Sequence, residues 1–96
     1  MKDPTPLFRR RKKISAVYLF GSTATGKTRR GSDIDLAVIA KKTISRPERL
    51  KLQADLSILF GKEVDLVIFR QAGPLLQHQI LKYGRLIFES DPAERI

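Results

Sequence analysis

The stretch VYLFGSTATGKTRRGSDIDLAVI, residues 17–39, decides the fold of this 96-residue chain. It holds two apolar runs rich in strand-forming residues, within Ser15–Phe20 and Ile34–Ile39, and between them a polar loop punctuated by glycines, Gly21–Gly31. A parallel pair of strands needs a longer crossover than this loop, so we do not expect the two strands to be simple parallel neighbours. The stretch therefore predicts a mixed sheet.

The rest of the chain continues this alternation of strands and helices. A helix is expected after Ser45, which forms a capping-box pattern with Glu48, and its predicted end is Gly61. The elements expected after it are a strand at Val64–Phe69, a helix at Pro74–Tyr83 and a strand at Arg85–Phe88. This order indicates an α/β (α+β) domain, with a small mixed β-sheet and helices packed on one face.

Composition limits the class of protein. Hydrophobic residues make up 42% of the chain, enough for a core, and the absence of cysteine excludes disulfide frameworks and thiolate metal sites. No apolar run approaches the ~20 residues of a membrane span, and the first residues lack the pattern of a signal peptide, so a cytoplasmic location is the expectation. We expect a basic, flexible arm at residues 1–14 and a single domain at 15–96.

The positive charge is unevenly distributed. The formal net charge is +9, and the stretch from Pro4 to Ser32 contains no acidic residue. A segment of one sign attracts polyanions such as nucleotides, RNA or the acidic face of a partner. For the run Arg9–Lys13 we favour a solvated basic tail, with RNA binding as the alternative.

Three aspartates interrupt the apolar strands. Asp33 and Asp35 are two residues apart, so their side chains project from the same face of the second predicted strand. Like charges placed side by side repel unless a cation lies between them, and carboxylates on a rigid strand suit Mg²⁺. If the third strand lies beside the second, Asp65 joins them, and three carboxylates can hold the two metal ions of in-line phosphoryl chemistry. Rim salt bridges to Arg or Lys are the alternative.

The loop after the first strand has features of a phosphate-binding loop. Gly21 allows a phosphate to approach the backbone, and Ser22 can offer a hydroxyl where amide groups favour anions. Three cations farther along can neutralise a triphosphate: Lys27, Arg29 and Arg30. An ordinary glycine turn with a capping serine is the alternative interpretation.

Residues 21–28 also match the pattern of a P-loop, G-x-x-x-x-G-K-[ST]. A P-loop needs a helix directly after its lysine to aim amide groups at the phosphates. Here only Arg29 and Arg30 precede Gly31-Ser32 and the next strand, which is less than one helical turn. We therefore reject a P-loop and retain phosphate binding.

Two segments separated by five residues together resemble the signature of the minimal nucleotidyltransferases of the DNA polymerase beta superfamily. They are Leu19-Phe20-Gly21-Ser22-Thr23-Ala24-Thr25-Gly26 and Ser32-Asp33-Ile34-Asp35-Leu36. Asp65 falls where that family has its third carboxylate. The resemblance implies a nucleotidyltransferase fold, two Mg²⁺ ions bound with nucleotide, ATP as substrate, and Ser32 among the nucleotide-binding residues. It also implies an antitoxin role toward a helical HEPN ribonuclease, in some members by adenylylating a tyrosine of that toxin.

Three functions follow from the residues and the resemblance. The first is transfer of AMP to a hydroxyl on a partner protein by an antitoxin, with Asp33, Asp35 and Asp65 as catalytic and metal-binding residues. The second is a catalytically weak module that neutralises its partner by contact, which Thr25 favours because the family commonly has arginine there. The third is nucleotide transfer to RNA, for which Arg9–Lys13 is the only support.

Overall fold

The computed structural model describes residues 3–21 and 33–90. Its elements in chain order are α1 (Thr5–Arg9), β1 (Ile14–Phe20), β2 (Ile34–Ala40), α3 (Arg46–Phe60), β3 (Val64–Ile68), the 3-10 helix η1 (Phe69–Gln71), α4 (Pro74–Tyr83) and β4 (Arg85–Glu89). The strands and the two longer helices predicted from the sequence are confirmed, with small differences at their ends. None of the helices in these two ranges combines the length and apolarity needed to cross a membrane.

The four strands form one mixed sheet in the order β3-β2-β1-β4. Strand β1 runs antiparallel to both β2 and β4, whereas β2 and β3 are parallel. The expectation that the first two strands are not parallel neighbours is therefore confirmed, and so is the pairing of the third strand with the second. The parallel pair is joined through α3, which is the crossover that such a connection requires.

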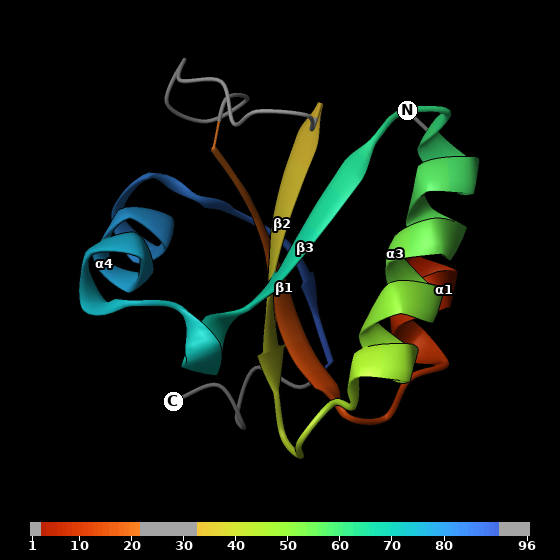
Figure 1. The fold of residues 1–96 in the computed structure, drawn as a ribbon, viewed down its shortest axis with the longest axis horizontal. Helices are drawn as coiled ribbons and strands as arrows, with labels where there is room; N and C mark the ends of the chain where they lie inside the picture. The colour runs from red at the N-terminus through yellow and green to blue at the C-terminus, as the bar shows by residue number, and fades with distance from the viewer. Residues whose placement is uncertain (1–2, 22–32, 91–96) are drawn as a thin grey trace.

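Helices cover both faces of the sheet, so the expectation of helices on one face only is wrong. Figure 1 shows the sheet between α4 on one side and α3 with α1 on the other. One core joins the sheet to α1 and α3 through Val17, Leu36, Val38, Phe8, Leu52 and Leu56. The second core joins it to α4 through Ala16, Tyr18, Phe20, Ala37 and Ile80. Apolar residues on both faces of the central strands require a helical layer on each side.

Helix α3 has the boundaries that its sequence predicts. The backbone N–H of Glu48 donates to Ser45 Oγ at 3.2 Å, and the N–H of Ser45 donates to Glu48 Oε1 at 3.0 Å, which completes the capping box. Gly61 ends the helix with φ +66°, a left-handed conformation that glycine adopts without steric cost. The helix therefore has a defined start and end beside the sheet.

The basic segment at the N-terminus is packed onto the domain, which corrects the expectation of a flexible arm for residues 3–14. Phe8 of α1 is fully buried, with its ring centroid 5.4 Å from that of Phe88 in β4. Arg11 contacts Asp55 at 3.3 Å and Lys13 contacts Glu48 at 2.8 Å, so both cations bind helix α3. One buried aromatic side chain and two ion pairs thus hold this segment against the domain, although its neighbouring cations repel each other.

Candidate active site

Asp35 and Asp65 are brought together by the parallel pairing of β2 and β3. Their Cα atoms are register partners in the ladder. Residues that alternate along a strand share a face, so Asp35 lies on the same side as Ala37, which belongs to the core under α4. Asp35 is fully buried and Asp65 is half-buried. The sequence-based expectation that these two carboxylates meet is thus realised in the backbone.

Gly21 makes room for the carboxylate of Asp35. The residue follows β1 directly and has φ +77°, and its neighbour Phe20 is the register partner of Asp35. A Cβ atom at position 21 would collide with Oδ2 of Asp35 and would lie 2.8 Å from its Cγ. Sequence reasoning assigned Gly21 to phosphate binding and missed this contact, because only the strand register shows which residue lies opposite Phe20.

Asp33 lies at the start of β2 and bonds to the start of β3. Its side chain is exposed, and its Oδ2 accepts a hydrogen bond of 3.3 Å from the backbone N–H of Glu63. The backbone N–H of Asp33 also donates to the carbonyl of Glu63 at 3.0 Å, which fixes the start of β2 against the start of β3. Across residues 3–21 and 33–90, no cluster of three or more acidic, histidine or cysteine side chains is arranged to hold a metal ion.

The donor groups nevertheless fit a hard divalent cation in kind. All three candidates are carboxylates at the start of two hydrogen-bonded strands, and oxygen donors of this kind are what Mg²⁺ prefers. Asp35 and Asp65 lie side by side with like charge, an arrangement that a cation stabilises. Asp33 is two residues from Asp35, and a rotation of its side chain away from Glu63 would bring a third carboxylate toward the pair.

Helix α3 holds strand β3, and with it Asp65, in position. The backbone N–H of Val64 donates to Ser57 Oγ at 3.1 Å, and that of Leu66 donates to Gln53 Oε1 at 3.0 Å. These two amides flank Asp65 along the strand. Sequence reasoning did not single out Gln53 or Ser57, since a polar residue on a helix gives no sign of which backbone group it will meet.

The remaining candidate residues lie outside the described ranges. They are Ser22, Lys27, Arg29, Arg30 and Ser32, the proposed phosphate-binding set beyond Gly21. The single histidine, His78, is exposed on α4, as expected for a surface residue.

Comparison with known proteins identifies a family for this chain. A model of the family described as polymerase beta, nucleotidyltransferase, matches residues 4–93. The chain belongs to this family. The nucleotidyltransferase fold expected from the sequence is therefore confirmed, and the matched range includes α1.

Several similar proteins have named activities and partners. Protein adenylyltransferase MntA of Shewanella oneidensis is 37% identical over 76 residues, which cover 79% of this chain and 55% of that protein. A chain in the crystal structure of a toxin–antitoxin complex with AMP-PNP has a TM-score of 0.72 and 32% identity, covering 94% of this chain and 74% of that one. A chain in the structure of a tri-AMPylated Shewanella oneidensis HEPN toxin in complex with its MNT antitoxin has a TM-score of 0.65 and 30% identity, with 86% and 63% covered. This nucleotidyltransferase thus spans about half the length of its curated MntA relative.

Proposed function

We propose that this chain is a Mg²⁺-dependent protein adenylyltransferase, which moves AMP from ATP to a hydroxyl group of a partner protein and acts as an antitoxin. The observation that carries the proposal is the buried carboxylate of Asp35, beside its register partner Asp65 and against Gly21. Burying a negative charge next to a second one costs free energy unless a cation is bound there, so the arrangement favours a metal-binding function. The adenylyltransferase MntA and the complex with AMP-PNP support ATP as the substrate.

The chemistry follows from the positions of the carboxylates. Asp33, Asp35 and Asp65 would hold two Mg²⁺ ions, which would neutralise charge on the α-phosphate and on the leaving pyrophosphate. The acceptor oxygen attacks the α-phosphorus, and the bond from that phosphorus to the pyrophosphate oxygen breaks. Asp65 is the more exposed carboxylate of the pair. It accepts the proton that the hydroxyl loses.

The loop after β1 would bind the rest of the nucleotide. Gly21 follows the last residue of β1 and packs against the carboxylate of Asp35, so the loop leaves the strand beside the candidate site. The hydroxyl groups and cations of this loop, namely Ser22, Lys27, Arg29, Arg30 and Ser32, are assigned to the β- and γ-phosphates. Thr25 stands where the family commonly has arginine, and Arg29 or Arg30 would replace that contact.

The acceptor is assigned to a partner protein of the HEPN type. A partner that covers the site would exclude water and bring its hydroxyl group, most simply a tyrosine, in line with the α-phosphate. The tri-AMPylated HEPN toxin seen in complex with an MNT antitoxin supports this assignment. A cytoplasmic location would suit both substrates.

Neutralisation by contact alone is the second candidate. The position of the Asp33 side chain, bonded to the Glu63 amide, and the threonine at position 25 both favour it. RNA as acceptor is named for none of the relatives described above and rests only on Arg9–Lys13.

A labelling experiment separates these candidates. The purified chain is incubated with α-labelled ATP and Mg²⁺, with and without the protein encoded by the neighbouring gene. Label should appear on that protein, and Asp35→Asn and Asp65→Asn should abolish the transfer. Glu63→Gln, which removes an exposed carboxylate that has no assigned role, should leave it intact. Formation of a complex that silences the partner with no label transferred would replace the enzyme by the binding module.

A further inference from the structure

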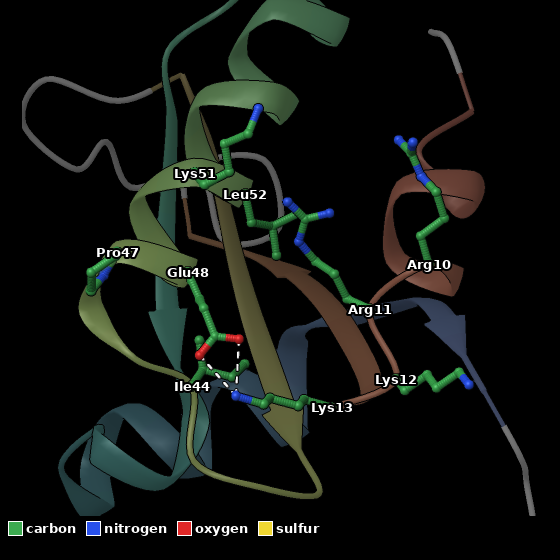
Figure 2. Close-up of a pocket in the computed structure, with 9 residues that line it drawn as sticks. All are labelled: Arg10, Arg11, Lys12, Lys13, Ile44, Pro47, Glu48, Lys51 and Leu52. Atoms are coloured by element: carbon green, nitrogen blue, oxygen red, sulfur yellow. Dashed lines mark hydrogen bonds and ion pairs between the residues drawn. The ribbon is translucent and has the colours of Figure 1, made fainter.

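Three neighbouring hollows surround the segment that links α1 to β1. The largest, about 630 Å³, lies between this segment and the first half of α3 (Figure 2). The other two measure about 530 and 350 Å³. Arg11 lines all three, which makes the segment a ridge bordered by grooves. We name the ridge and its three grooves the basic surface.

Positive charge is in excess on the basic surface. The cations that line it are Arg9, Arg10, Arg11, Lys12, Lys13, Lys41 and Lys51, and the acids are Glu48, Asp55 and Glu89. Both acids of α3 are already ion-paired, Glu48 with Lys13 and Asp55 with Lys51 and Arg11. No described acid lies within ion-pair distance of Arg10 or Lys12, which are both exposed. These two side chains therefore contribute to the excess of charge.

The cations are held by the fold rather than carried on a loose tail. Figure 2 shows Arg11 and Lys13 reaching toward α3, whereas Arg10 and Lys12 extend from the other side of the segment. Phe8, fully buried, anchors the helix immediately before them. A ligand that binds Arg10 and Lys12 would order little additional backbone, which lowers the entropic cost of binding.

The basic surface is separate from the candidate active site. Its segment enters β1 at Ile14, and Gly21 follows the last residue of β1, so the two ends are roughly 20 Å apart at about 3.3 Å per residue. The basic surface also adjoins α3, on the face of the sheet opposite to α4. A ligand bound there would not displace nucleotide from Asp35 and Asp65.

We propose that the basic surface binds the phosphodiester backbone of single-stranded nucleic acid. Connected grooves along a ridge suit a chain-like polyanion better than a compact anion. Arginine guanidinium groups bind phosphate through paired hydrogen bonds. The floor of the largest groove is apolar, with Ile44, Pro47 and Leu52, and can accept sugar rings. Among the described residues that line this groove none is aromatic, so contacts to phosphates and sugars dominate there, and such contacts carry no sequence information.

Binding of the full chain to a labelled oligouridylate of roughly twelve nucleotides tests the proposal. Anisotropy is followed between about 50 and 200 mM salt, and the slope of log K against log salt concentration is about −0.7 per phosphate contact for single strands. The double variant Arg10→Gln/Lys12→Gln should bind more weakly, and its slope should be smaller by about 1.4. The matched control, Lys62→Gln/Lys82→Gln, removes the same charge from two exposed residues elsewhere and should keep the parent's slope. An oligodeoxyuridylate should behave like the RNA.

Other results would overturn the proposal. Equal weakening in both double variants would mean that net charge alone attracts the oligonucleotide. Competition by inorganic triphosphate as strong, per charge, as that by the oligonucleotide would indicate a compact anion site. Equal competition by polyglutamate would indicate an acidic protein partner. Thermal unfolding of each variant is measured alongside, and Lys12→Glu alone, which reverses an exposed charge, should weaken binding further than Lys12→Gln.

Discussion

Asp35 and Asp65 lie opposite each other as Cα partners across the parallel strands β2 and β3, and the first of them is fully buried. Like charges on one face of a sheet repel each other, and the proposed metal ions would offset that repulsion. Variants of the two residues should therefore separate activity from stability.

Asp35→Asn should abolish transfer and leave the thermal midpoint equal or higher. The substitution keeps the shape of the side chain and removes a buried charge. Loss of a metal-binding carboxylate costs several kcal/mol of transition-state stabilisation, or roughly a hundredfold or more in rate. Labelled transfer and thermal unfolding are measured on the same preparation. Full activity in a normally folded variant would refute the metal-binding role, and inactivity caused by unfolding would refute the separation.

Gly21→Ala should damage the site more than a matched glycine substitution. Gly21 and Gly61 both have positive φ, so alanine costs about 1–2 kcal/mol of backbone strain at either position. At Gly61 the new methyl group meets no atom within 4 Å, whereas at Gly21 it collides with the carboxylate of Asp35. Urea unfolding should show the larger loss of stability for Gly21→Ala, and only this variant should lose transfer. Similar behaviour of the two variants would contradict the contact.

Phe8→Ala should destabilise the domain by about 3–5 kcal/mol, the usual cost of truncating a buried phenylalanine. Phe8 is fully buried against Phe88, and no part of a detached arm would show such a dependence. Ile58→Ala serves as the control, because Ile58 is 80% exposed and its truncation should cost under about 0.5 kcal/mol. Chemical unfolding gives both values. A small loss of stability in Phe8→Ala would support the interpretation of this segment as a flexible arm.

Stability should fall in acid partly because of Glu48. The ammonium group of Lys13, and then the backbone and hydroxyl of Ser45, lower the pKa of Glu48 from its ordinary 4.5 to about 2. A lowered pKa in the folded state means that the ionised form contributes stability above pH 4.5, and that this contribution is lost as the pH falls toward 2. Asp55, whose pKa is lowered first by Lys51, adds to the same trend.

Glu48→Gln should flatten the stability profile between these pH values. Urea midpoints at a series of pH values measure it, and Lys13→Gln, which removes the largest cause of the shift, should flatten the profile in the same direction. A Glu48→Gln profile parallel to that of the parent would show that other carboxyl groups carry the acid sensitivity.

Mg²⁺ should bind weakly to the chain alone and more tightly with a non-hydrolysable ATP analogue. Magnesium keeps several waters and uses substrate phosphates as ligands, and one oxygen of Asp33 is bonded to the amide of Glu63. Titration calorimetry with and without the analogue gives the two affinities. Equal affinities would count against a shared metal and phosphate site.

Much of this fold could be predicted because its signals are local. The capping box at Ser45 and the glycine at position 61 set the ends of α3, and the apolar run of β3 was recognisable with Asp65 inside it. Adjacency of β2 and β3 needed one assumption, and the pairing of Asp35 with Asp65 confirms it. The turn of Asp33 toward Glu63 depends on the end of the strand pair, which no local pattern reports.

The errors came from contacts distant in sequence. Phe8 directly precedes the cations Arg9–Lys13, whose charge suggests a solvated segment. It packs against Phe88, eighty residues away in the sequence. The position of α4 was also missed, although continuous apolar residues in β1 indicate burial on both faces and so a helix on each. A correct use of that pattern would have placed α4 across the sheet from α3.

The bonds from Gln53 and Ser57 to β3 also affect how copies of this protein can associate. Strands β3 and β4 form the two margins of the sheet, and amides of Val64 and Leu66 on β3 already donate to α3. An incoming strand that pairs with β3 would have to displace these two bonds. The contacts that hold Asp65 in position therefore also disfavour growth of the sheet by strand addition along β3.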